Sequence, residues 1–574
     1  MQESKTSSVS AKAPTKYPAL FGLAYRYRAP NGAWVFGINY WRIAISVLSM
    51  IFLLWILLTV FVFVYVKHYR GWDNMSVIDA IEMPFNRAEI NKKYGEYDID
   101  RAKKALEQGD LNAGIKYLYS GIARSPRNLE ARRLLAQIYI ARYRRNDYAV
   151  TVLETAVPYA YNDLSYMRLY LSLLLELSED AKIVAVGEKI LEIPDLTADV
   201  KKYLAMTISN TYALHGNYTK SDEFIKNYEL EGATAAIRRL SLNQWEQGHR
   251  EEAIKIAKDA ISRVRNPEPL YGLLMNYYTS LSNFDEARHY AILRSVEKPF
   301  DIKQRIEFLR ILEKSGETER VNRELETLYT QNIKDEKALL AIANFATDQR
   351  NIELMNKIYN TAIESSFSLA PFTLLMVETL ITSKKYKDAL AISEEIVRKK
   401  PSWLGSYMDV FNCLRSAAYS GDGNNEMAGI LINEVLKSKR VPPRTLITTA
   451  KRFSDLGDNS MAHKILSETV EANPRHQLAL TRLIQIEILM GNSTNLDKNI
   501  FRLIQMRRPP RDLILEARKN LDSDLFIFTA NREKVMEEIE ALLNRENTDK
   551  IKVLSALPDS DDSRIIEFNP DEDE

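Results

Sequence analysis

The sequence of 574 residues has few of the residues and motifs that support catalysis or metal binding. It contains one cysteine, Cys413, which excludes an intramolecular disulfide and a multi-cysteine metal site. The six histidines are scattered, and none has a metal-binding spacing such as HExxH. No GxxxxGK[ST] or GxSxG motif is present, and no GxGxxG follows a strand. We therefore expect no enzyme activity, no catalytic residues, no metal and no cofactor, and we expect Cys413 to be a small buried residue on a helix.

The composition also lacks a charge excess and lacks the residues that interrupt helices. The 78 basic and 77 acidic residues leave a net charge of +1, whereas a dedicated nucleic-acid binder usually has a strong basic excess. Only 20 glycines and 19 prolines occur, and no strand-rich block interrupts the chain. A chain of this length does not form one compact core. A quasi-linear array of helices, in which each unit contacts its neighbours, explains the composition better than several globular domains.

Residues 43–66 contain no charged side chain and are long enough to cross a bilayer core of about 30 Å. Aromatic rings flank the run, with Tyr40 and Trp41 at one end and Tyr65 and Tyr69 at the other. The sequence therefore predicts a single transmembrane helix. Six basic residues and one acidic residue precede it, although basic residues are nearly balanced close to its two ends. Because a basic tail crosses membranes poorly and large C-terminal domains cross regardless of charge, we predict a cytoplasmic N-terminus.

An interval of 34 residues recurs through the second half of the chain. Two short helices and two turns fill such an interval, whereas no single helix or strand has that period. One phase contains Ala253, Ala287, Val321, Met355 and Ala389. Five positions earlier, a phase of small or polar residues contains Gly248, Ser282, Gly316, Arg350 and Lys384, and a third phase contains Pro299 and Pro401. After an expansion of five residues, the interval returns at Ala428, Ala462 and Leu496.

These residues resemble the tetratricopeptide-repeat family. The first hairpin carries Gly109-Asp110 at its turn and Pro126 at its end, and Phe284 and Tyr386 occupy the aromatic position of later turns. The resemblance implies an all-α fold, a right-handed α-solenoid of about twelve helical hairpins preceded by the transmembrane helix. It is weak over residues 129–200, and another helical-hairpin solenoid, half-a-tetratricopeptide or Sel1-like, is the alternative.

The chain is expected to have six parts. They are a disordered basic tail (1–42), the transmembrane helix (43–66), a juxtamembrane connector (67–98), the repeat array (99–511), capping helices (512–546) and an acidic disordered tail (547–574). Residues 21–40, which are aromatic and basic, are read either as a membrane-surface segment on an anionic leaflet or as a docking peptide. Residues 565–568 in the acidic tail are a second candidate peptide ligand.

The resemblance also implies where partners bind, because the first helix of each hairpin lines a concave groove. It displays its second, fifth, ninth, twelfth and thirteenth residues there. The candidate groove residues are Arg238, Trp245, Asn276, Arg310, Asn344 and Glu378. Asn276 and Asn344 are favoured, because an amide can both donate to and accept from an extended peptide backbone. Trp245 is read either as a groove anchor or as a packing residue.

We therefore expect a membrane-anchored scaffold that recruits or organises protein partners through this groove, in a bacterial envelope assembly and with the array outside the cytoplasm. The expected partners are proteins or peptides and the membrane itself, with no nucleic acid and no small-molecule substrate. The alternative is a regulatory or assembly subunit of a membrane enzyme complex, with the array facing the cytoplasm. A glycan-binding groove would need several aromatic residues, and only Trp245 qualifies.

Overall fold

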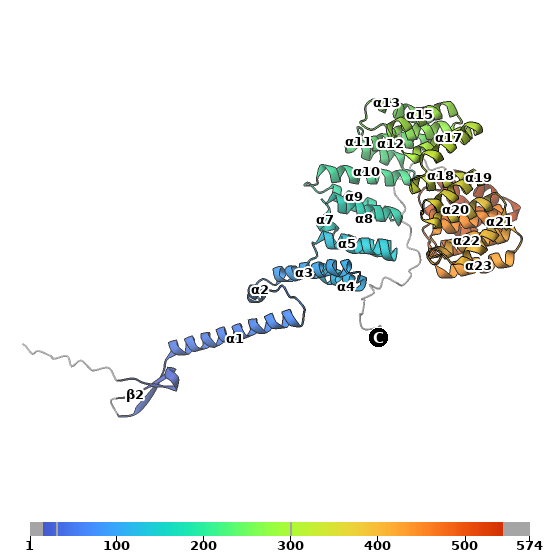
Figure 1. Ribbon diagram of the computed structural model, residues 1–574. Coiled ribbons are helices and arrows are strands. Elements are labelled where there is room, and N and C mark those ends of the chain that lie inside the picture. The colour runs from blue at the N-terminus through green and yellow to red at the C-terminus, as the bar shows by residue number, and fades with distance from the viewer. Residues whose placement is uncertain (1–14, 30–31, 299–300, 544–574) are drawn as a thin grey trace, which may run out of the picture. The chain divides into compact units, whose positions relative to one another are not determined.

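The computed structural model describes residues 15–29, 32–298 and 301–543 (Figure 1). The chain divides into two compact units, residues 1–160 and 161–574, each of which is described by itself. The expected acidic tail, the candidate ligand at 565–568 and Pro299 lie outside the described residues.

The first unit combines a small sheet, one long helix and the first hairpins. Its elements are β1 (Tyr17–Ala19), η1 (Leu20–Gly22), β2 (Ala24–Arg28), β3 (Trp34–Ile38), α1 (Tyr40–His68), α2 (Val77–Glu82), α3 (Arg87–Glu107), α4 (Leu111–Arg124), α5 (Leu129–Ile138), the π-helix η2 (Tyr139–Tyr143), α6 (Asn146–Glu154) and α7 (Val157–Ala160).

Residues 17–38 differ from the disordered tail that the sequence analysis expects. They form an antiparallel sheet in the order β1-β2-β3, with pairs such as Tyr17 with Arg26 and Arg28 with Trp34. Aromatic residues favour a pleated surface, and cross-strand pairs of large side chains stabilise it. The basic and aromatic composition of this segment therefore gives a short sheet, and the all-α prediction applies from α1 onward.

Helix α1 contains the whole predicted span at residues 43–66 and extends beyond it at both ends. Its most apolar 18-residue window has a mean hydropathy of 2.9, and none of that window is buried. The Asn39 side chain caps the helix by accepting a hydrogen bond from the backbone N–H of Arg42. By length and composition, α1 is suited to cross a bilayer.

The expected connector at residues 67–98 is largely helical. Its chain turns back after α1, so that Trp72, Met75 and Ile90 form a small buried cluster with Val66 near the end of α1. Helix α2 begins at a capping box, in which Ser76 and Asp79 satisfy each other's backbone N–H groups. The first hairpin helix, α3, starts at Arg87 rather than near residue 99.

The second unit is helical throughout its described residues. Its elements are α8 (Leu164–Glu176), α9 (Asp180–Leu191), α10 (Ala198–Leu214), α11 (Tyr218–Asn227), α12 (Thr234–Glu246), α13 (Arg250–Ala260), α14 (Glu268–Ser280), α15 (Phe284–Glu297), α16 (Ile302–Lys314), α17 (Thr318–Gln331), α18 (Glu336–Asp348), α19 (Ile352–Glu364), α20 (Leu369–Thr382), α21 (Tyr386–Lys399), α22 (Leu404–Gly421), α23 (Asn425–Ser438), α24 (Pro443–Asp455), α25 (Asn459–Ala472), α26 (Gln477–Met490), α27 (Leu496–Gln505), α28 (Arg511–Leu521), η3 (Asp524–Phe526) and α29 (Arg532–Leu543).

Consecutive helices pair into twelve hairpins, from α3–α4 and α5–α6 in the first unit to α26–α27 in the second. The predicted solenoid of about twelve hairpins is thereby confirmed. Each residue of the first 34-residue phase is buried, because there the second helix of a hairpin meets its neighbours. Its members are Ala253, Ala287, Val321, Met355, Ala389, Ala428, Ala462 and Leu496. Cys413 is also buried, on α22, and burial raises the pKa of its thiol to about 11.

The second phase marks the turn inside each hairpin, where the backbone is left-handed. Positive φ angles occur at Gly248, Ser282, Gly316, Arg350, Lys384, Gly423, Gly457 and Gly491. Glycine adopts this conformation freely, whereas Arg350, for example, does so at a φ of 56° and at some energetic cost. In several turns the next residue is an asparagine or aspartate that caps the following helix, as Asn351 does for α19.

In the second unit, residues distant in sequence form a cluster of charged contacts, here called the clasp: Glu179, Asp180, His215, Tyr218, Glu246, Arg475, Arg507 and Arg508. Both nitrogens of the Arg507 fork donate to Asp180, at 2.7 Å each, and His215 lies 3.1 Å from the same carboxylate. Burial by itself would raise the pKa of Asp180, but the hydrogen bonds from Arg507 and His215 lower it. Arg508 contacts Tyr218 and Glu246, and Arg475 pairs with Glu179.

Replacing Arg507 by alanine should destabilise the second unit by about 2–4 kcal/mol. The Asp180 side chain is only 4% exposed, so the substitution leaves a buried carboxylate without its principal partner. Urea unfolding measures the free energy, and hydrogen exchange should accelerate in α9 and at the α27–α28 connection. As a control, Lys451→Ala breaks an exposed pair with Asp455 and should change stability by less than about 0.5 kcal/mol. Equal effects of the two substitutions would contradict a structural role for the clasp.

Candidate peptide-binding groove

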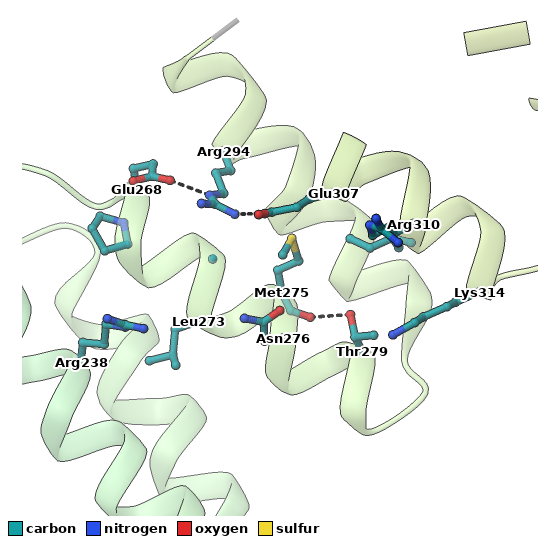
Figure 2. A pocket seen from close by; sticks show the side chains of 13 residues that line it. Arg238, Glu268, Leu273, Met275, Asn276, Thr279, Arg294, Glu307, Arg310 and Lys314 are labelled. Atoms are coloured by element: carbon teal, nitrogen blue, oxygen red, sulfur yellow. Dashed lines mark hydrogen bonds and ion pairs between the residues drawn. The ribbon is translucent and has the colours of Figure 1, made fainter. Parts of the chain in front are cut away.

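Three successive first helices, α12, α14 and α16, form a groove with a volume of about 620 Å³ (Figure 2). Helix α14 supplies the floor through its second, fifth, ninth and twelfth residues, which are Pro269, Gly272, Asn276 and Thr279. These are positions at which the family resemblance implies groove-facing side chains. The groove therefore follows from the regular repetition of the hairpins.

Arg238, Asn276 and Arg310, three of the six residues predicted from the sequence, lie together in this groove. Figure 2 shows Arg238 on one wall, Asn276 near the centre, and Arg310 with Lys314 on the opposite wall. Apolar lining comes from Leu273, Met275 and Ile311. The arrangement places cationic ends at both sides of a partly apolar slot.

The edge of the groove is held by an ion-pair bridge. Arg294, on α15, donates from Nε to Glu268 Oε1 at 2.5 Å and from Nη1 to Glu307 (Figure 2). Gln304 Nε2 also donates to Glu268 Oε1, at 3.2 Å. Burial by itself would lower the pKa of Arg294, but hydrogen bonds and charges from the two carboxylates raise it. Because Arg294 and both acids are already paired, they position the walls rather than offer free binding groups.

The remaining polar groups of the groove are open to a ligand. Among the described residues, no hydrogen bond or ion pair engages the side chains of Arg238, Lys314 or Asn276, and all three are exposed. Arg310 pairs with Asp348 at 2.6 Å, but both side chains are about half exposed, so this pair exchanges readily with solvent or ligand. Four basic residues and two acidic residues line the groove, which leaves it an excess of two positive charges.

Trp245 lies outside this groove and serves packing. Its ring stacks on Tyr277 of α14, with centroids 3.9 Å apart and planes 7° apart, and the Arg250 guanidinium lies 4.1 Å from it. Tyr277 also hydrogen-bonds Ser241 across the hairpins, at 3.0 Å between oxygens. Of the two readings the sequence left open, packing against the neighbouring helix accounts for this geometry.

Asn344 and Glu378 are on α18 and α20 and are not part of the groove lined by Asn276. The Asn344 side chain is exposed and donates to the carbonyl of Leu340, one turn earlier, at 2.7 Å. Glu378 accepts an ion-paired hydrogen bond from Arg452 on α24. The ladder of Asn276 and Asn344 is therefore not brought to one site, and Glu378 is used to tie two hairpins together.

Sequence reasoning missed the bridge of Glu268, Arg294 and Glu307. Glu268 and Glu307 occupy the first and sixth positions of their helices, and Arg294 lies on a second helix, none of which the family pattern marks as groove-facing. Only the packing of α15 against α14 and α16 brings the three charges together. Within the described part of the chain, no cluster of three or more His, Cys, Asp or Glu residues has a metal-binding arrangement.

Replacing Trp245 by alanine should lower the free energy of unfolding by about 2–3 kcal/mol, because it removes the stack between α12 and α14. Trp245→Phe should retain most of that stability. Thermal unfolding of the full chain distinguishes the two variants. A stable Trp245→Ala variant that had lost only peptide binding would show instead that this ring is a groove anchor.

Comparisons with known proteins agree on repeat architecture. A family model described as tetratricopeptide repeat matches residues 105–173. No curated protein sequence matches the chain. Similar solved structures include a tetratricopeptide repeat protein from Parabacteroides merdae (15% identity, TM-score 0.28, covering 44% of this chain and 97% of that one). Others are PilW, a type IV pilus biogenesis factor (17%, 0.28, 36% and 95%), and yeast Tom70 (12%, 0.29, 79% and 96%).

Structural similarity at these scores says nothing about what this chain binds. The family match falls on the first hairpins, where the sequence carries Gly109-Asp110 and Pro126. The helices continue in the same paired pattern to α27. The match and the twelve hairpins together confirm the predicted tetratricopeptide-repeat array.

Proposed function

We propose that this protein is a single-pass membrane scaffold that recruits other proteins by binding an extended, acidic peptide segment in the groove between α12 and α16. The observation that carries the proposal is the set of unengaged groups at Arg238, Lys314 and Asn276. Two cations at opposite walls favour carboxylates, and a central amide can pair with a peptide backbone. The apolar lining between them accepts an intervening aliphatic side chain.

The shape of the groove supports a peptide rather than a compact small molecule. It is open, it runs across three successive hairpins, and its polar groups are spread along it rather than converging on one point. An extended chain places backbone groups at regular intervals, which suits a surface built from repeated helices. Affinity then comes from several modest contacts, and membrane anchoring raises the local concentration of the recruited partner.

Membrane anchoring is supported at both ends of α1. The side chains of the span are exposed, as lipid contact requires. At the end of the span, Val77, Ile78, Ile81 and Phe85 in and just after α2 are also exposed, although α2 packs on α1. Apolar side chains in this position fit the boundary between hydrocarbon and headgroups.

We further propose that the N-terminus lies in the cytoplasm and that the array acts outside it, in assembly of a bacterial cell envelope. The charge of the N-terminal 42 residues supports this orientation, since six basic residues accompany one acid. A scaffold outside the cytoplasm would collect envelope proteins in the plane of the membrane.

The groove is tested with fluorescent acidic, neutral and basic peptides of equal length and the full chain in nanodiscs. Acidic peptides should bind best, and Asn276→Ala should weaken them by about 5–30-fold through loss of one or two hydrogen bonds. A double charge reversal, Arg238→Glu with Lys314→Glu, should abolish acidic-peptide binding and favour basic peptides. Fluorescence anisotropy measures each affinity.

Asn344→Ala is the matched control, because it removes an exposed asparagine at the same position of another first helix outside the groove. It should leave peptide binding unchanged. Equal effects of Asn276→Ala and Asn344→Ala, or acidic-peptide binding that survives the charge reversal, would contradict the groove as the binding site.

Orientation is tested by protease treatment of intact and lysed spheroplasts, with an antibody to the C-terminal tail. We expect the tail epitope to be lost in intact spheroplasts, because the repeat array lies outside the cytoplasm. A cytoplasmic reporter protein must stay intact in the same sample. Protection of the tail until lysis would favour the alternative, a cytoplasm-facing subunit of a membrane enzyme complex.

A further inference from the structure

The register of the N-terminal sheet sorts its side chains into two different faces. Directly paired residues of antiparallel strands lie on the same face, and successive residues alternate. The pairs Arg28 with Trp34 and Arg26 with Phe36 therefore share one face, which Tyr17 joins through its pairing with Arg26. The opposite face carries Tyr25, Tyr27, Val35 and Gly37. We call the first the arginine face: Tyr17, Arg26, Arg28, Trp34, Phe36 and Ile38.

The large apolar groups of the arginine face are solvent-exposed. Trp34 is 49% exposed, Phe36 68% and Ile38 52%. The guanidinium groups of Arg26 and Arg28 lie 5.1 and 5.9 Å from the Trp34 ring, and Tyr17 meets the same ring edge-on. Aromatic rings interleaved with arginines form a surface that is apolar and cationic at once.

Charge around this face has one sign. Residues 15–42 contain Lys16, Arg26, Arg28 and Arg42, and no aspartate or glutamate. The array, by contrast, mixes acids and bases along nearly every helix. A cationic surface without internal counter-charges attracts an anionic partner and releases bound counter-ions when that partner arrives.

The sheet is joined directly to the membrane helix. Only Asn39 separates β3 from α1, and its backbone N–H donates to the carbonyl of Leu23 at 2.9 Å. The Arg42 guanidinium packs over Gly22, where any side chain would collide with it. Tyr40 and Trp41, both highly exposed, mark the start of the helix. Since these rings favour the interfacial zone, the sheet lies at the depth of the lipid headgroups once α1 spans the bilayer.

We propose that the arginine face binds anionic phospholipid headgroups of the leaflet at the N-terminal end of α1. This inference rests on the membrane span of the proposed function. Arg26 and Arg28 pair with lipid phosphates, while Trp34, Phe36 and Ile38 enter the headgroup–acyl boundary. Two features select a lipid surface over a protein partner, namely the continuity of the face with the span and the absence of acids around it. The sheet thus acts as a second attachment point that responds to lipid charge.

The test places an environment-sensitive dye on either face of the same strand. Phe36→Cys reports the arginine face, and Val35→Cys, the next residue along β3, reports the opposite face. Cys413 is fully buried, so the dye reacts at the introduced thiol, and the wild-type chain measures residual labelling. The full-length protein is compared in nanodiscs of phosphatidylcholine and in nanodiscs that also contain phosphatidylglycerol.

We expect a blue shift and an intensity gain at residue 36 that grow with phosphatidylglycerol content and shrink at high salt. Residue 35 should respond much less. Adding Arg26→Gln and Arg28→Gln should remove the dependence on phosphatidylglycerol at residue 36 while leaving the helix inserted. Equal responses at residues 35 and 36, or a response at residue 36 that ignores lipid charge, would overturn the inference. A signal that stays as it is in detergent would indicate a protein-docking face instead.

Resistance to extraction by alkaline carbonate reports insertion of α1 separately. If α1 inserts but the dye shows no lipid dependence, only this inference fails. If α1 does not insert, the membrane anchor of the proposed function fails as well, and the groove experiment still stands.

Discussion

The architecture depends on one constraint, which is that a two-helix hairpin cannot bury its apolar face alone. Each hairpin becomes stable only when the next one covers it, so the residue at each crossing must be buried and fit the gap. The alanines at 253, 287 and 389, and the larger Val321 and Met355, meet this requirement. Once hairpins stack with this spacing, their first helices form a continuous wall. The groove at α12, α14 and α16 is a consequence of that stacking, and its chemistry is set by residues that packing leaves free.

This constraint explains why much of the fold could be predicted from the sequence. A 34-residue period needs a reversal at a fixed place, and the left-handed turns at Gly316 and Gly457 lie where the second phase predicts them. The groove position of Asn276 was predictable for the same reason, because the ninth residue of a first helix always points to that side. Trp245 and Glu378 could not be assigned from position alone. Their roles depend on partners, Tyr277 and Arg452, that only the three-dimensional packing identifies.

The N-terminal sheet shows where reasoning from composition fails. Lysine, serine and proline at the start of the chain indicate disorder, yet the aromatic residues that follow alternate in a way that suits short paired strands. Strands of three to five residues give too weak a periodic signal to detect in one sequence. The clasp was unpredictable for a different reason. Arg507 and Asp180 are separated by more than 300 residues, so no local pattern links them.

The clasp and the groove meet at α12. Arg508 contacts Tyr218 and Glu246, and Glu246 is the last residue of the helix that carries Arg238. On the same helix, Arg239 donates to Asn210 at 2.7 Å, and burial lowers its pKa. Helix α12 is therefore held from outside the groove by contacts with α10, α11 and the α27–α28 connection. A wall fixed before the ligand arrives loses little conformational entropy on binding. Because the clasp is built from ion pairs, the same rigidity makes peptide affinity sensitive to changes at the far end of the array.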